Sequence, residues 1–109
     1  MRLTYVMKFV ADMDRAVAFY RDTLGLTLRF QSPGWSEFDT GETTLALHAA
    51  SDRKPAGSVE LGFGVADVDA FHREKAAAGV AFTRPPETEH GVKLAAFLDC
   101  EGAEVGVSG

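Results

Sequence analysis

Apolar and polar residues alternate along several short stretches of the chain, as in β-strands, whereas in other stretches the apolar residues are spaced so that they share one face of a helix. Between Asp12 and Gly25, apolar residues recur at three- and four-residue spacing: Met13, Ala16, Val17, Tyr20 and Leu24. Asp12 is suited to cap this helix at its start, and Gly25 to end it in a left-handed conformation. Later strands are predicted over Leu26–Gln31, Trp35–Thr40, Thr43–Ala49, Ala81–Thr83, Val92–Leu98 and Ala103–Val107.

A short internal repeat divides the chain into two similar halves. The segment VADMD at residues 10–14 recurs as VADVD at residues 65–69, and each copy follows an alternating strand and opens a helix. We therefore predict one α+β domain over residues 1–109, built from two βαβββ modules at about residues 1–50 and 58–109. Polar residues 51–57 form the connector. The strands are expected to form a curved, cup-shaped mixed sheet with the helices on the outside.

The alternation within each strand predicts which side chains face away from the helices. The expected floor of the cup consists of Tyr5, Met7, Phe9, Ala46, His48, Glu60, Gly62 and Gly106. Trp35 and Phe38 either line its mouth or belong to the core or a dimer interface. Val59, Leu61, Phe63 and Val65 share the opposite face of their strand, which is expected to lie under a helix. Apolar walls with few polar groups are typical of small-molecule pockets.

Composition narrows the possible functions. The net charge of −5 comes without any cluster of Lys and Arg, which argues against nucleic acid as a partner. No apolar run reaches the roughly 20 residues needed to span a bilayer, and the first residues lack the pattern of a signal peptide. Cys100 is the single cysteine, so no internal disulfide can form. We expect a cytoplasmic protein that binds neither nucleic acid nor membranes.

Two segments resemble a known group of proteins. Residues 12–26, which include the run FYRDTLG, and residues 97–102 (FLDCEG) are similar to the vicinal oxygen chelate superfamily of glyoxalase I, bleomycin-resistance proteins and extradiol dioxygenases. The resemblance implies paired βαβββ modules and a homodimer. In metal-using members, one ligand comes from each of four strands, at positions that correspond here to Tyr5, Ala46, Glu60 and Gly106. Of these only Glu60 is an ordinary metal ligand, so the sequence argues against the metal chemistry of the family.

Position 9 bears on glyoxalase activity. The resemblance aligns Phe9 with a position at which glyoxalase I carries a basic residue, and that residue binds the carboxylate of glutathione. Because a phenyl ring cannot replace that charge, glyoxalase I activity on glutathione adducts is not expected.

The leading hypothesis is a metal-independent protein, without a cofactor, that holds an apolar or aromatic small molecule. Its expected ligand-binding residues are Tyr5, Met7, Phe9, Trp35, Phe38, Ala46, His48, Glu60 and Gly62. The alternative is a lyase, isomerase or dioxygenase with Glu60 as its base, or with a divalent metal held by Glu60 and His48. A third possibility is a protein that acts by binding a protein partner.

Three side chains keep two interpretations each. His48 is expected to hydrogen-bond Glu60 or a ligand rather than a metal. Tyr5 either donates a hydrogen bond to a ligand or fills space. His90, in residues 87–90, belongs to a solvated loop or to a lid.

Overall fold

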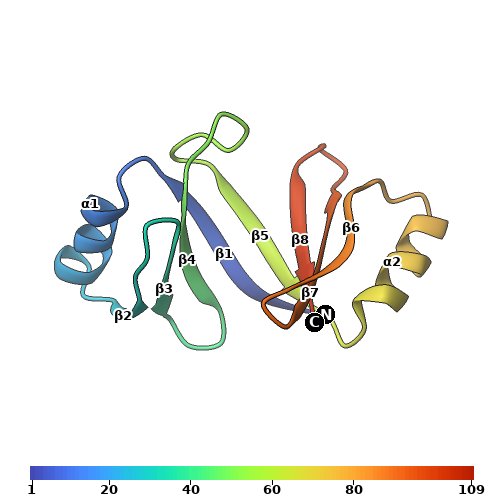
Figure 1. Cartoon of the computed structure of the whole chain (residues 1–109), viewed down its shortest axis with the longest axis horizontal. Coiled ribbons are helices and arrows are strands. Elements are labelled where there is room, and N and C mark those ends of the chain that lie inside the picture. Colours follow the sequence, from blue (N-terminus) through green and yellow to red (C-terminus); the bar gives the residue numbers. More distant parts are fainter. The chain divides into compact units, whose positions relative to one another are not determined.

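The chain divides into two compact units in the computed structural model, which describes all 109 residues. The N-terminal unit comprises Thr4–Glu60, and the C-terminal unit comprises Met1–Leu3 together with Leu61–Gly109. In each unit a strand is followed by a helix and three further strands (Figure 1). The prediction of an α+β protein with two βαβββ modules is confirmed. None of the helices is long and apolar enough to cross a membrane.

The N-terminal unit contains four strands and one helical segment. These elements are β1 (Arg2–Val10, whose first two residues belong to the C-terminal unit), α1 (Met13–Ala18), the π-helical turn η1 (Phe19–Thr23), β2 (Thr27–Phe30), β3 (Trp35–Asp39) and β4 (Thr44–Ala49). Their strands are ordered β2-β3-β4-β1. β1 runs parallel to β4, whereas β3 is antiparallel to both β2 and β4. Between the parallel strands β1 and β4 the chain passes through the helix, β2 and β3, a connection long enough for parallel pairing.

The C-terminal unit repeats this order. Its elements are β5 (Val59–Gly64, whose first two residues belong to the N-terminal unit), α2 (Val68–Ala77), β6 (Phe82–Glu89), β7 (Val92–Leu98) and β8 (Glu104–Ser108). The strands are ordered β5-β8-β7-β6, with β5 parallel to β8 and the other pairs antiparallel. The helix α2 packs against β6 and β7.

Both helices begin as the repeat predicts. The Asp12 carboxylate accepts a hydrogen bond from the backbone N–H of Arg15 at 3.1 Å, and Asp67 accepts one from Ala70 at 3.0 Å. These bonds satisfy N–H groups that have no partner within the helix. At the other end, Gly25 has a φ angle of 77°, a left-handed conformation that costs a residue with a Cβ atom roughly 1–2 kcal/mol.

The predicted helical stripe is wrong at Leu24, whose side chain is 53% exposed. Met13, Ala16 and Tyr20 do pack against the buried Val17, as predicted. The five-residue π turn η1 then adds to the residues per turn, so the positions that follow rotate away from the core. Leu26, beyond the glycine, packs there instead.

Two strands of the second half also differ from the predictions. β6 extends to Glu89, so Glu87–Glu89 pair with β7 and form neither a loop nor a lid; only the turn at His90–Gly91 remains. β6 contains Pro85 and Pro86, which cannot donate hydrogen bonds to a neighbouring strand. They are tolerated because β6 is an edge strand and its register is irregular around Arg84. In β5, Val59 and Leu61 are exposed by 53% and 41%, because α2 covers β6 and β7 instead.

Each unit has its own core. In the N-terminal unit Val17 of α1, Phe38 of β3 and Leu47 of β4 are almost completely buried against one another. In the C-terminal unit Val68, Ala95 and Val107 form the centre, with the rings of Phe71, Phe82 and Phe97 packed around them. The helix side of each sheet is therefore occupied by packing, which leaves the opposite side of the strands for other roles.

We expect Phe38→Ala to lower the free energy of unfolding by about 3–5 kcal/mol, because it removes a buried ring and leaves a cavity beside Val17 and Leu47. Phe30→Ala on the neighbouring strand is the matched control. Its side chain is 45% exposed, so the loss should stay below about 1 kcal/mol. Urea denaturation followed by circular dichroism measures both, and equal losses in the two variants would contradict the assigned core.

Candidate functional site

The side of β1, β3 and β4 that faces away from α1 carries a row of rings. Strand register places Trp35 opposite His48, and His48 opposite Phe9. Tyr5 of β1 lies on the same side, because it differs from Phe9 by an even number of residues. We call Tyr5, Phe9, Trp35 and His48 the aromatic face. The predicted parity of β1 and β4 is confirmed by this register.

The four rings are in mutual contact. The ring centroids of Phe9 and His48 are 5.0 Å apart, those of His48 and Trp35 are 5.7 Å apart, and those of Trp35 and Tyr5 are 5.9 Å apart. These separations and their tilted or edge-on geometries are typical of favourable aromatic pairs. Phe9 is only 4% exposed, whereas Tyr5, Trp35 and His48 are half-buried. The face therefore presents ring surface that the protein itself covers only in part.

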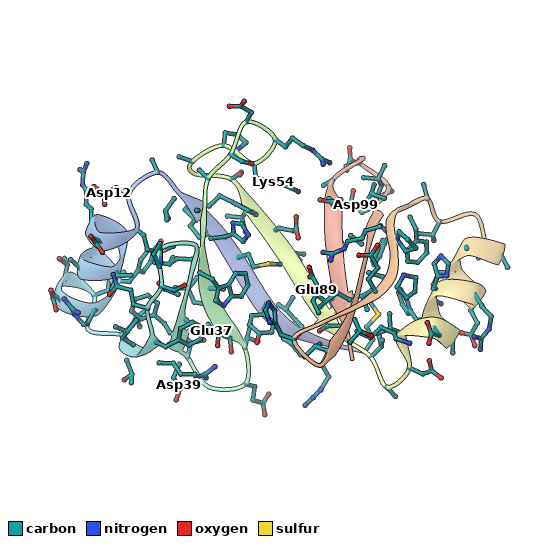
Figure 2. The ribbon with its side chains drawn as sticks, in the orientation of Figure 1. Asp12, Glu37, Asp39, Lys54, Glu89 and Asp99 are labelled. Carbon is teal, nitrogen blue, oxygen red and sulfur yellow. The ribbon has the colours of Figure 1, made fainter.

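Glu37 holds the indole of Trp35 in place. The Nε1–H of Trp35 donates to Glu37 Oε2 at 2.8 Å, and Arg29 Nη1 donates to Glu37 Oε1 at 3.0 Å. Arg29 also donates to Thr44 Oγ1 at 3.2 Å and lies 3.8 Å from Asp39. The Glu37 side chain is only 12% exposed, so both of its oxygens need these donors. Figure 2 shows Glu37 and Asp39 on β3.

Sequence reasoning missed Glu37 and Arg29 as part of this site. The signal was present in β3, because Glu37 is two residues from Trp35 and must share its side of the strand. Phe38 is three residues from Trp35 and must point the other way. The prediction that Phe38 binds the ligand is accordingly wrong, since its ring is fully buried between α1 and the sheet with Val17 and Leu47.

Glu60 is engaged in an ion pair. Lys54 Nζ donates to Glu60 Oε1 at 2.6 Å, with side-chain exposures of 27% and 14%. The same ammonium group lies 5.9 Å from the centroid of the Phe9 ring, within the range of a cation–π contact. Figure 2 shows Lys54 in the connector after β4. Lys54 had no signal in the sequence, because it is one of several polar residues in a loop.

His48 does not hydrogen-bond Glu60, contrary to one of its two expectations. Its Nδ1 atom lies 2.8 Å from the carbonyl oxygen of Ala49. Because a carbonyl oxygen can only accept, Nδ1 carries the hydrogen of the neutral ring. The other nitrogen, Nε2, is then an acceptor on the aromatic face.

The remaining predicted residues fall into two groups. Met7 and Ala46 are opposite each other in the register of β1 and β4, between the row that contains His48 and the row that contains Tyr5; Ala46 is fully buried. Gly62 and Gly106 belong to the C-terminal unit, where they pair with each other and Gly106 pairs with Ala96. Gly62 and Ala96 are buried, and Arg84 of β6 follows Ala96 in the register.

The residues at the four implied ligand positions do not fit a divalent cation. Ala46 and Gly106 offer no donor side chain, and the Glu60 carboxylate is bound to Lys54. Burial, and then the charge of Glu37, raise the pKa of Tyr5, against a smaller opposing effect of Arg29, so its phenolate form is disfavoured. No group of three or more His, Cys, Asp and Glu side chains is arranged to hold a metal ion.

An open depression elsewhere in the N-terminal unit carries no comparable chemistry. It is lined by residues 11–14 and 31–33. Its two acids are engaged within the protein, because Asp12 caps α1 and Asp14 accepts a hydrogen bond from Gln31 at 2.8 Å.

Comparison with known proteins gives one matching family and several similar structures. The model of the Glyoxalase/Bleomycin resistance protein/Dioxygenase superfamily matches residues 2–107. An uncharacterized protein of Mycolicibacterium smegmatis is 34% identical over 92 residues, which are 84% of this chain and 78% of that protein.

Solved structures of low sequence identity share the fold. A variant of the Streptomyces coelicolor methylmalonyl-CoA epimerase, in complex with 2-nitronate-propionyl-CoA, has a TM-score of 0.81 at 21% identity, covering 99% of this chain and 93% of that one. A Vibrio splendidus member of the glyoxalase/bleomycin resistance protein/dioxygenase superfamily has a TM-score of 0.72 at 14% identity, covering 98% and 97%. A hypothetical protein of Bacillus halodurans has a TM-score of 0.79 at 19% identity, covering 98% and 92%.

We expect Glu37→Gln to lower the pKa of Tyr5. The negative charge of Glu37 disfavours the Tyr5 phenolate, and its removal also leaves the charge of Arg29 less compensated. A Tyr20→Phe background leaves Tyr5 as the only tyrosine, so the ultraviolet absorbance of the phenolate reports its titration. Glu42→Gln, at an exposed position, is the control and should leave the titration unchanged. An unchanged or raised pKa in Glu37→Gln would show that Glu37 does not act on Tyr5.

Proposed function

The chain belongs to the Glyoxalase/Bleomycin resistance protein/Dioxygenase superfamily, and we propose that it binds an aromatic or apolar small molecule on the aromatic face without a metal ion. The observation that carries the proposal is the row of four contacting rings on the side of β1, β3 and β4 opposite the helix. Proteins of this superfamily include enzymes, so the proposal selects one of the roles that its members perform.

Partly exposed rings are the main support for an aromatic ligand. A planar molecule stacked on Trp35 and Tyr5 would cover ring surface that the protein leaves partly accessible to water. Aromatic pairs contribute about 0.5–1.5 kcal/mol each beyond the burial of their area. Two or three such contacts would add about 1–4.5 kcal/mol to the free energy gained by burial of the ligand itself.

Preorganisation of Trp35 also supports a binding role. The indole of Trp35 donates a hydrogen bond to Glu37, and the backbone N–H of Trp35 donates to Ser32 Oγ at 3.1 Å. Glu37 is in turn held by Arg29, which also contacts Thr44. A side chain that is already ordered loses little conformational entropy when a ligand arrives. The energy of stacking is then available for affinity.

Glu60 supports binding over catalysis. As a general base it would have to accept a proton, but its Oε1 atom lies 2.6 Å from the ammonium group of Lys54. A base must have a free oxygen directed at the ligand, and this oxygen is occupied by Lys54. The likeness to an epimerase concerns the fold and adds no argument for its reaction at this low identity.

Binding is tested by the fluorescence of Trp35, the single tryptophan. Titration with planar aromatic compounds, such as naphthol and quinoline, should give saturable quenching. Tyr5→Ala should weaken the affinity by roughly tenfold, since it removes one ring from the face. Phe19→Ala, which removes an exposed ring on η1, should leave the affinity unchanged. Absence of quenching across a broad panel of aromatic compounds would refute the proposed function.

Independence from metal is tested separately by elemental analysis and chelation. We expect the untagged protein to contain no stoichiometric zinc, nickel, iron or manganese, and its affinity for naphthol to survive dialysis against a chelator. A stoichiometric metal that is lost in Glu60→Ala or His48→Ala would instead support the enzymatic alternative with a rearranged metal site.

A further inference from the structure

We propose that His48 selects the ligand: its Nε2 atom accepts a hydrogen bond from a hydroxyl group on an uncharged aromatic ring. This inference rests on the proposed function and adds the chemical class of the ligand to it. It follows from the hydrogen bonds of His48 and from the charges around the aromatic face.

The acceptor character of Nε2 comes from the backbone. A neutral imidazole has one N–H donor and one acceptor nitrogen. Nδ1 lies 2.8 Å from the Ala49 carbonyl oxygen, which can only accept, so Nδ1 is the donor. Nε2 is therefore the acceptor, because the hydrogen bond of one ring nitrogen determines the role of the other.

The Nε2 atom of His48 is accessible to solvent. His48 has no hydrogen bond other than the one to Ala49. No buried side-chain nitrogen or oxygen of the protein lacks a hydrogen-bond partner, so Nε2 must be in contact with water. A ligand hydroxyl can replace that water without loss of hydrogen bonding, whereas a ligand without a donor would leave Nε2 unsatisfied.

The neighbouring rings orient the ligand plane. His48 lies between Phe9, at 5.0 Å, and Trp35, at 5.7 Å, and is edge-on to the indole with an interplanar angle of 86°. Because the indole and the imidazole are in contact, an aromatic ring that stacks on Trp35 would lie near His48. A hydroxyl group on the edge of that ring can reach Nε2, whereas a donor on a long flexible arm gains less because it must be ordered.

The charges of the face disfavour an anionic ligand. Its two cations are both paired, Arg29 with Glu37 and Lys54 with Glu60. Asp39 adds a third acid beside Arg29, at 3.8 Å. A carboxylate on the ligand would meet three acids and only two bases, neither of them free, so a neutral hydroxylated aromatic compound fits better than an aromatic acid.

The test compares naphthol with its methyl ether, two ligands of similar shape of which only naphthol can donate. Isothermal titration calorimetry is carried out in mildly alkaline buffer, where imidazole side chains are neutral. The native protein should bind naphthol about five- to tenfold more tightly than the ether, the range expected for one hydrogen bond. His48→Phe retains a ring but no acceptor, so it should bind the two ligands equally. Naphthoic acid should bind more weakly than naphthol.

The outcomes separate the two proposals. Equal binding of naphthol and its ether by the native protein would overturn the role of His48 and leave aromatic binding intact. Absence of binding by both would overturn both proposals. A preference for naphthol that persists in His48→Phe would also overturn the role of His48.

Nitrogen NMR of the three histidines gives a readout that needs no folded variant. In the native protein one imidazole should carry its hydrogen on Nδ1, and the resonance of its Nε2 should shift on addition of naphthol but not of the ether. A hydrogen on Nε2 of His48 in the free protein would refute the proposal.

Discussion

The register between β1, β4 and β3 is the constraint on which the candidate site depends. Parallel pairing of β1 with β4, and antiparallel pairing of β4 with β3, align Phe9, His48 and Trp35 in one row across three strands. Because side chains alternate between the two sides of a strand, a shift of one residue would exchange this row for core residues. The core opposes such a shift, since Leu47 and Phe38 on the other side are buried against α1. Packing on one side of the sheet thereby determines the chemistry on the other.

Two ion pairs flank the aromatic face. They hold neighbouring side chains in place but add little to the free energy of folding. Arg29 and Glu37 stand beside Trp35, and Lys54 and Glu60 stand beside Phe9. Half-buried pairs of this kind contribute little to folding on balance, because the charges lose hydration when they pair. They do hold the indole in one orientation and leave no free cation next to the rings. Both effects are consistent with the flat, uncharged ligand that we propose.

The chain keeps the fold of its superfamily but not the donor atoms at the positions where the resemblance implies metal ligands. Ala46 is a fully buried methyl group, and Tyr5 contributes a ring to the aromatic face. Glu60 remains a carboxylate but is neutralised by Lys54 from the connector. Rings and small groups at such positions offer packing surface instead of ligand atoms for an ion.

Local and periodic features of this protein were determined by its sequence alone. The Asp12 and Asp67 caps, the glycine stops, the repeated βαβββ order and the sides of β1 and β4 all depend on neighbouring residues or on strand alternation. The π turn that exposes Leu24, the length of β6 and the partners of Glu37, Glu60 and His48 were decided only by the tertiary structure. These features depend on which distant side chain fills a given space, and Lys54 reaches Glu60 only because the connector folds back beside β1. Periodicity carries no information about such contacts, since it records the side of an element but not what lies against it.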